Sequence, residues 1–239
     1  MVKLQILSLF SVKRTVKAFP MSKTHIYFVP GLAAGKEIFK NIILPEDTYE
    51  LHIIEWLLPD KKESLSAYAK RMASLVTENN SVLIGVSFGG VMVQEMAAFL
   101  KLKKLIIISS VKCRSELPKR FTVAKLTKAY KLLPTGWVAT AGDLARFAIG
   151  PRSKKRLKLY DEYLSVKDKV YLDWAIENMI NWSRKEPSKE VYHIHGDIDP
   201  VFPIKNIKNV ITLENGSHIM ILNKGSKVSK LVQNIIENA

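Results

Sequence analysis

A serine flanked by glycines is the residue in this chain best suited to chemistry. Gly85-Val86-Ser87-Phe88-Gly89 lies between an apolar run at 81–86 and an amphipathic run at 91–100, a pattern that predicts a strand, a sharp turn and a helix. Such a turn needs small residues on both flanks, because the serine backbone is strained and the strand and helix pass close beside it. The turn lifts the Ser87 hydroxyl clear of the sheet, where it can act as a nucleophile.

Two later loops carry the carboxylates and the imidazole that could serve such a serine. The first loop is His195-Gly196-Asp197-Ile198-Asp199-Pro200, and the second is Asn215-Gly216-Ser217-His218. Asp197 and Asp199 compete for the role of the acid, and an Asp before proline is also a common turn former. His218 competes with the four other histidines, His25, His52, His193 and His195.

The composition of the chain argues against several other classes of protein. The chain has 239 residues, 47% of them hydrophobic, which fits one globular domain. No apolar run reaches the length of a transmembrane helix. The single cysteine, Cys113, excludes an intramolecular disulfide, fits a reducing compartment and predicts a cytoplasmic protein. We find neither a nucleotide-binding glycine spacing nor a zinc-like Cys/His cluster, so we expect no cofactor, no metal and no nucleic acid.

The net charge of +15 is unevenly distributed. Residues 112–190 contain 18 basic and 9 acidic residues, and residues 1–20 contain 4 basic residues and no acidic one. This surplus either attracts acidic partners or forms a solvated surface. Residues 1–20 are interpreted as a basic extension without a cleavable signal, since most charges follow its short apolar stretch. It is either a membrane-touching amphipathic tail, or Met21 is the true start.

The elements expected around these motifs alternate between strand and helix. Strands are predicted at 26–29, 51–54, 82–86, 105–109, 191–195 and 210–213, and helices at 62–78, 88–100 and 226–237. This alternation predicts an α/β fold with a doubly wound, mostly parallel sheet.

A long segment without strand-like runs interrupts this alternation. Helical stretches are predicted there at 117–133, 153–165 and 168–182, and three of the four tryptophans lie in it. We expect residues 21–111 and 190–239 to form the core and residues 112–189 to form a helical cap over the carboxyl ends of the strands, where α/β sheets bind ligands.

With these motifs in hand, the chain resembles the α/β-hydrolase superfamily over about residues 24–111 and 190–238. The order Ser, Asp, His is that of the family. Its H-G-x-x-D-x-x-V-P pattern appears as residues 195–203, with Phe202 in place of valine. The resemblance implies that Ser87 is the nucleophile, Asp199 the acid and His218 the base, and that His195 is structural.

The resemblance also implies an oxyanion hole. Its donors would be the amides of Phe88 and Leu32, the latter in the loop after the first strand. Many family members have His-Gly where this chain has Pro30-Gly31, a change that spares the backbone donor.

The function expected from this resemblance is a serine hydrolase that cleaves a carboxylic ester or thioester with an apolar acyl group. The partners would be small acyl esters or thioesters, with an acidic carrier such as acyl carrier protein or coenzyme A favoured by the basic cap. One alternative is a lyase or acyltransferase, similar to a lyase of menaquinone synthesis, in which Arg114, Arg120 and Arg146 hold an anionic substrate. A non-catalytic ligand-binding member is the third hypothesis.

Overall fold

The computed structural model describes residues 22–132, 163–188 and 190–238. In these ranges, six strands form one sheet in the order β2-β1-β3-β4-β5-β6, and every neighbouring pair is parallel. The strands are β1 (Thr24–Val29), β2 (Tyr49–Ile53), β3 (Ser81–Val86), β4 (Leu102–Ile108), β5 (Val191–Gly196) and β6 (Ile211–Leu213). The predicted parallel α/β sheet is confirmed, with each strand within a few residues of its expected place.

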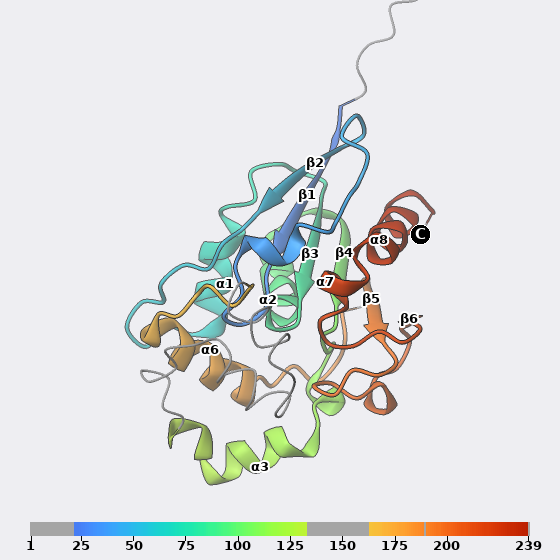
Figure 1. Cartoon of the computed structure of the whole chain (residues 1–239). Helices are drawn as coiled ribbons and strands as arrows, with labels where there is room; N and C mark the ends of the chain where they lie inside the picture. The colour runs from blue at the N-terminus through green and yellow to red at the C-terminus, as the bar shows by residue number, and fades with distance from the viewer. Residues whose placement is uncertain (1–21, 133–162, 189, 239) are drawn as a thin grey trace, which may run out of the picture.

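Helices cover both faces of this sheet (Figure 1). They are α1 (Leu65–Ala73), α2 (Phe88–Met96), α3 (Lys119–Thr127), α6 (Lys169–Asn181), α7 (Met220–Asn223) and α8 (Gly225–Asn238). Short 3₁₀ turns are η1 (Lys36–Phe39), η2 (Ala97–Phe99), η3 (Arg114–Glu116), η4 (Ala129–Leu132) and η6 (Ile204–Asn206). None of the helices in the described ranges has the length and hydropathy needed to span a bilayer.

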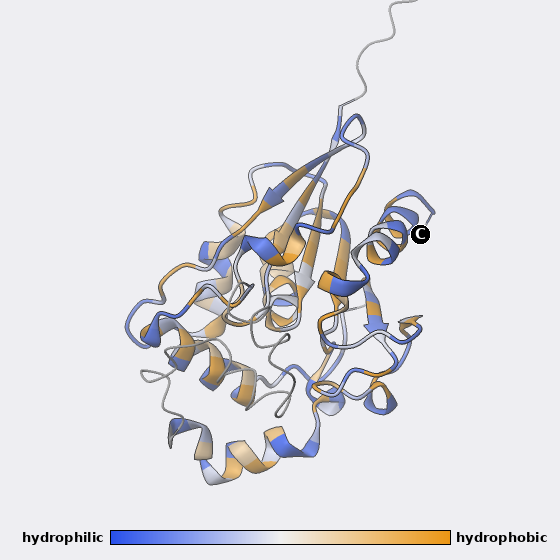
Figure 2. Cartoon of the chain, in the orientation of Figure 1, coloured by the Kyte–Doolittle hydropathy of each residue, from blue (hydrophilic) through white to orange (hydrophobic). Residues whose placement is uncertain are grey.

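Two hydrophobic cores lie on opposite faces of the sheet because successive strand residues point to opposite sides. Along β1, Tyr27 and Val29 pack with α1, α2 and α6, whereas Ile26 and Phe28 pack with η1, α7 and α8. Figure 2 shows the hydrophobic residues gathered along the central strands and on the helices beside them. The apolar strands are therefore buried on both faces, as a doubly wound sheet requires.

Capping side chains explain where two helices begin. The hydroxyl of Ser64 accepts a hydrogen bond from the amide of Ala67, so α1 starts at Leu65 rather than at residue 62. The carboxylate of Asp168 accepts one from the amide of Tyr171, which fixes the start of α6.

The side of β1 on which the chain adds its next strands changes after β2. β2 lies on one side of β1 and β3 on the other, so the connections that follow β1 and β3 diverge at the carboxyl ends of these strands. A crevice at such a switch point is where doubly wound sheets bind ligands. Figure 1 shows α3 and α6 beyond this end of the sheet. The described residues between β4 and β5 form helices and turns and contain no strand, while the predicted helix at 153–165 lies almost entirely outside the described residues.

Candidate active site

Ser87 occupies a strained turn between β3 and α2. Its φ and ψ are 54° and −118°, a conformation that non-glycine residues adopt only when the surroundings enforce it. The surroundings here are tight, since a Cβ on Gly85 would lie 2.2 Å from the Gly89 carbonyl oxygen, and one on Gly89 would lie 2.2 Å from the Pro30 oxygen. The Ser110 hydroxyl donates to the Ser87 carbonyl at 2.7 Å and fixes the turn from below.

Three side chains from distant loops meet at this serine. The Ser87 Oγ lies 3.0 Å from His218 Nε2, and His218 Nδ1 lies 2.8 Å from Asp199 Oδ2. An ionised carboxylate only accepts hydrogen bonds, so Nδ1 of His218 carries the proton and Nε2 is left as an acceptor. The Ser87 hydroxyl therefore donates to His218, which is the tautomer that a general base requires.

The Asp199 carboxylate is buried and held by several donors. Its Oδ1 accepts from the amides of Val201 at 2.7 Å and Phe202 at 3.0 Å. Burial alone raises the pKa of Asp199, but the His218 ring, by charge and hydrogen bond, and the amide of Phe202 outweigh it and hold that pKa below its usual value. Asp199 is therefore ionised at neutral pH. The edge of the Phe202 ring also faces His218, with centroids 5.5 Å apart.

The structure separates the two candidate acids. Asp199 faces His218, whereas Asp197 Oδ1 accepts from the amide of Gly216 at 3.1 Å and braces the turn that leads to the histidine. The two residues have different partners, although they are only two positions apart.

His193 and His195 are buried, and His195 lies beside Asp199. His195 Nε2 lies 2.8 Å from the Phe202 carbonyl and 3.5 Å from Asp199 Oδ2. Since a carbonyl only accepts, Nε2 of His195 carries the proton, and its Nδ1 accepts from His193 Nε2 at 3.2 Å. Burial lowers the pKa of both histidines, with the His195 charge adding to the effect at His193. They are neutral parts of the scaffold.

The loop after β1 lies directly against the serine and is anchored by a tryptophan. The Gly31 carbonyl accepts from the amide of Ala34 at 3.1 Å and from Trp56 Nε1 at 3.0 Å. The Gly31 carbonyl and the Leu32 amide belong to one trans peptide and point in opposite directions. Anchoring the carbonyl therefore fixes the direction of the Leu32 N–H. The sequence analysis did not single out Trp56, because its contact with Gly31 depends on the packing of the chain after β2.

Aromatic rings cluster beside the turn. The Trp56 ring stacks on Phe88 at a centroid distance of 5.4 Å and contacts Tyr171 of α6 at 5.3 Å. Trp174, also on α6, meets the Phe88 ring edge-on at 6.4 Å. The helix start that follows Ser87 is thus enclosed by apolar surface from three parts of the chain.

The arginines considered as anion ligands have other partners. Arg114 donates to the carbonyls of Ile180 and Trp182 at the end of α6. Arg120 of α3 donates to the carbonyl of Val201, two positions after Asp199. Arg146 lies outside the described residues.

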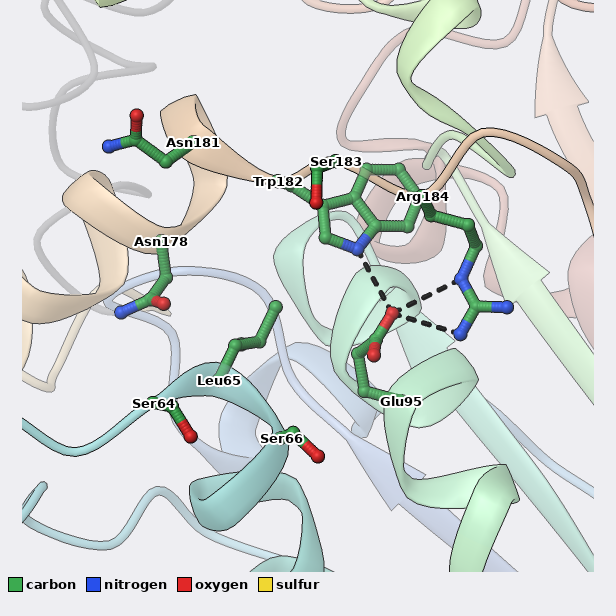
Figure 3. A pocket seen from close by; sticks show the side chains of 9 residues that line it. All are labelled: Ser64, Leu65, Ser66, Glu95, Asn178, Asn181, Trp182, Ser183 and Arg184. Carbon is green, nitrogen blue, oxygen red and sulfur yellow. Dashed lines mark hydrogen bonds and ion pairs between the residues drawn. The ribbon is translucent and has the colours of Figure 1, made fainter.

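A pocket of about 460 Å³ opens elsewhere, between the start of α1 and the end of α6 (Figure 3). Ser87, His218 and Asp199, called the triad below, do not line it. Within it, Glu95 of α2 accepts from Trp182 Nε1 at 3.0 Å and from Arg184 at 2.9 Å, contacts that tie the end of α6 to α2.

Comparison with known proteins gives a clear result for structure only. No family model matches the chain, and no curated protein matches it by sequence. A carboxylesterase structure from Nitrososphaera gargenis is 13% identical, with a TM-score of 0.66 over 90% of both chains. A bromoperoxidase from Bacillus anthracis is 14% identical, with a TM-score of 0.64 over 91% of this chain and 93% of that one. The chain has the α/β-hydrolase fold.

Other chains with this α/β-hydrolase fold carry different activities. A laboratory-evolved variant of a potato epoxide hydrolase is 15% identical, with a TM-score of 0.62 over 91% of this chain and 93% of that one. The similar structures are named as an esterase, a bromoperoxidase and an epoxide hydrolase. The fold alone therefore does not identify the reaction. Function must be argued from the site.

Proposed function

We propose that this protein is a serine hydrolase that cleaves a carboxylic ester or thioester through an acyl-enzyme. The observation that carries the proposal is the continuous hydrogen-bonded chain from Ser87 through His218 to the buried Asp199. A nucleophile, a base in the correct tautomer and an ionised acid that orients the base are the parts that acyl transfer needs. A serine in the turn also argues against epoxide hydrolysis and dehalogenation, in which this fold uses an aspartate.

In the proposed reaction, Ser87 Oγ attacks the acyl carbon while His218 Nε2 takes the hydroxyl proton. Asp199 stabilises the imidazolium that forms. The amides of Leu32 and Phe88 would donate to the oxyanion, and Phe88 is the first residue of α2, where the helix dipole favours negative charge. His218 then gives its proton to the leaving alcohol or thiol. A water molecule then gives a proton to His218 Nε2 and attacks the acyl carbon, and the bond to Ser87 Oγ breaks as the serine takes that proton back. The carboxylic acid product is released.

The apolar character proposed for the acyl group is supported by Trp56 and Trp174, two partly buried rings that lie against Phe88 beside the Ser87 turn. The lyase or transferase alternative for anionic substrates is less well supported. It needs arginines free to hold carboxylates, whereas Arg114 and Arg120 donate to backbone carbonyls. An acidic carrier remains part of the proposal because of the charge of the cap.

The test is the replacement of the nucleophile. Ser87→Ala should abolish turnover of p-nitrophenyl esters and labelling by a fluorophosphonate, while Ser66→Ala, an exposed serine on α1, should retain both. A series of acyl chain lengths would then define the acyl group. Undiminished turnover in Ser87→Ala would contradict the proposal, and labelling without turnover on any acyl substrate would favour the binding-protein hypothesis.

A further inference from the structure

Three metal-ligating side chains meet at the edge of the sheet, away from the triad. β2 is an edge strand that pairs with β1, with His25 opposite Glu50 and Tyr27 opposite His52. Residues in register, and residues two apart on one strand, project to the same face of a sheet. The side chains of His25, Glu50 and His52 therefore gather on one face at the β2 edge of the sheet.

The separations between their ligand atoms suit a single ion. His25 Nδ1 lies 2.9 Å from His52 Nε2. Glu50 Oε2 lies 4.0 Å from His25 Nδ1, and Glu50 Oε1 lies 3.8 Å from His52 Nε2, so one ligand atom from each residue lies within 4.8 Å of the other two. Ligand atoms of a tetrahedral zinc ion, with bonds of about 2.0–2.1 Å, are about 3.3 Å apart. The separation between the two nitrogens is shorter than that value and the separations to Glu50 are longer, so side-chain rotations would be needed to complete the geometry.

The His52 ring is already oriented. It stacks on the Tyr27 ring, at 4.5 Å and 17°, and lies edge to edge with the His25 ring in nearly the same plane, at a centroid distance of 5.2 Å and 13°. Tyr27 is buried, and its hydroxyl lies 3.0 Å from Thr77 Oγ1. A ligand held against a fixed ring loses less freedom on binding than a mobile one. The side chains of His25, His52 and Glu50 are 26%, 30% and 51% exposed, so an ion can reach them from solvent.

We propose that His25, Glu50 and His52 bind one divalent transition-metal ion, with Zn²⁺ as the favoured ion. Two imidazoles and one carboxylate suit Zn²⁺, Co²⁺, Ni²⁺ and Cu²⁺, whereas Mg²⁺ and Ca²⁺ prefer sites made of oxygen alone. Three protein ligands leave a fourth position to water. The ion links the edge strand β2 to β1 and stabilises that edge.

The site is independent of the proposed hydrolase. His25 lies at the start of β1, about 13 Å along the strand from Val29, near which the Ser87 turn is built. Sequence spacing could not reveal it, because the two histidines are 27 positions apart and meet only through strand register.

The experiment measures Zn²⁺ binding to the full-length chain without a histidine tag, by titration calorimetry. We expect one ion per chain, and no heat with Mg²⁺. His25→Asn and His52→Asn should each weaken binding at least about tenfold, since even indirect supports of a metal ligand are worth that much. Glu50→Gln should weaken it as well. Glu55→Gln, which removes an exposed carboxylate of the chain after β2, should bind as the wild type does.

Two further measurements locate the ion. Zn²⁺ should raise the Tm of the wild type and of Glu55→Gln but not of His25→Asn, because an ion that binds only the folded state stabilises it. If His52→Asn fails to fold, anomalous diffraction from Zn²⁺-soaked wild-type crystals decides the location. The proposal is overturned if His25→Asn and His52→Asn bind Zn²⁺ as tightly as the wild type, if only His218→Ala loses binding, or if the soaked ion lies elsewhere.

Discussion

Asp197 and Asp199 are identical side chains two positions apart that have different hydrogen-bond partners. Asp199→Asn keeps the shape of the side chain but gives His218 an amide that no longer selects the tautomer with the proton on Nδ1. We expect kcat for a p-nitrophenyl ester to fall by about 10³–10⁴. Asp197→Asn is the matched control, because its carbonyl can still accept from Gly216, and its kcat should stay within about tenfold of the wild type. Equal losses in both variants would contradict the assignment of the acid.

The buried histidines give the fold a pH dependence of its own. The pKa values of His193 and His195 are lowered, chiefly by burial, so the unfolded chain binds more protons than the folded one just below pH 6.5. The free energy of unfolding should therefore fall as the pH falls from 7 towards 5.5, by up to about 1.4 kcal/mol per pH unit for each histidine. His193→Gln, which keeps a donor for His195, should reduce this slope. Urea denaturation at several pH values would measure it, and an equal slope in the variant would refute the idea.

Among the elements, the loop after β1 and the segment after β2 act together through Trp56. Trp56→Phe removes the hydrogen bond to the Gly31 carbonyl but retains a ring against Phe88. The Gly31 carbonyl then keeps only its hydrogen bond from Ala34, so the Leu32 amide is held less firmly. We expect kcat to fall about tenfold while KM changes little, a smaller effect than the direct loss of an oxyanion donor. Trp182→Phe, which breaks a comparable bond to Glu95, should lower the Tm without changing kcat. Unchanged kcat in Trp56→Phe would show that the loop holds its shape alone.

The sequence predicted correctly those elements that depend on residues close together in the chain. Strands such as β3 are continuous apolar runs, and the Ser87 turn has its small residues within five positions. The predicted helix boundaries were less accurate, because one capping side chain, such as that of Ser64, determines the residue at which a helix begins. The Trp56 anchor and the His25–His52 pair were missed, since they depend on register and packing between strands that the sequence pattern does not specify.

For the whole molecule, the uneven charge leads to a test of the acidic carrier. Residues 112–190 contain nine more basic than acidic residues, and exposed charges are screened over about 8 Å at physiological salt. Raising the salt concentration should raise KM for an acyl-coenzyme A thioester and leave KM for a neutral ester unchanged. Changing Lys154, Lys155 and Arg156 to glutamate, at positions outside the described residues, should have the same effect at low salt. If both substrates respond alike, the carrier is excluded.

The order of the strands also determines when the sheet and the proposed active site can be completed during folding. β4 pairs with β5, so Leu105 must find Val191 across the entire intervening segment, a contact that closes a long loop and slows folding. Asp199 and His218 both follow β5, and His218 is 131 positions beyond Ser87, so a ribosome adds them long after the serine. A nascent chain can present the Ser87 hydroxyl long before it has a base to activate it. The enzyme we propose would therefore be inactive early in its synthesis, and activity would appear only after β5 and β6 have docked.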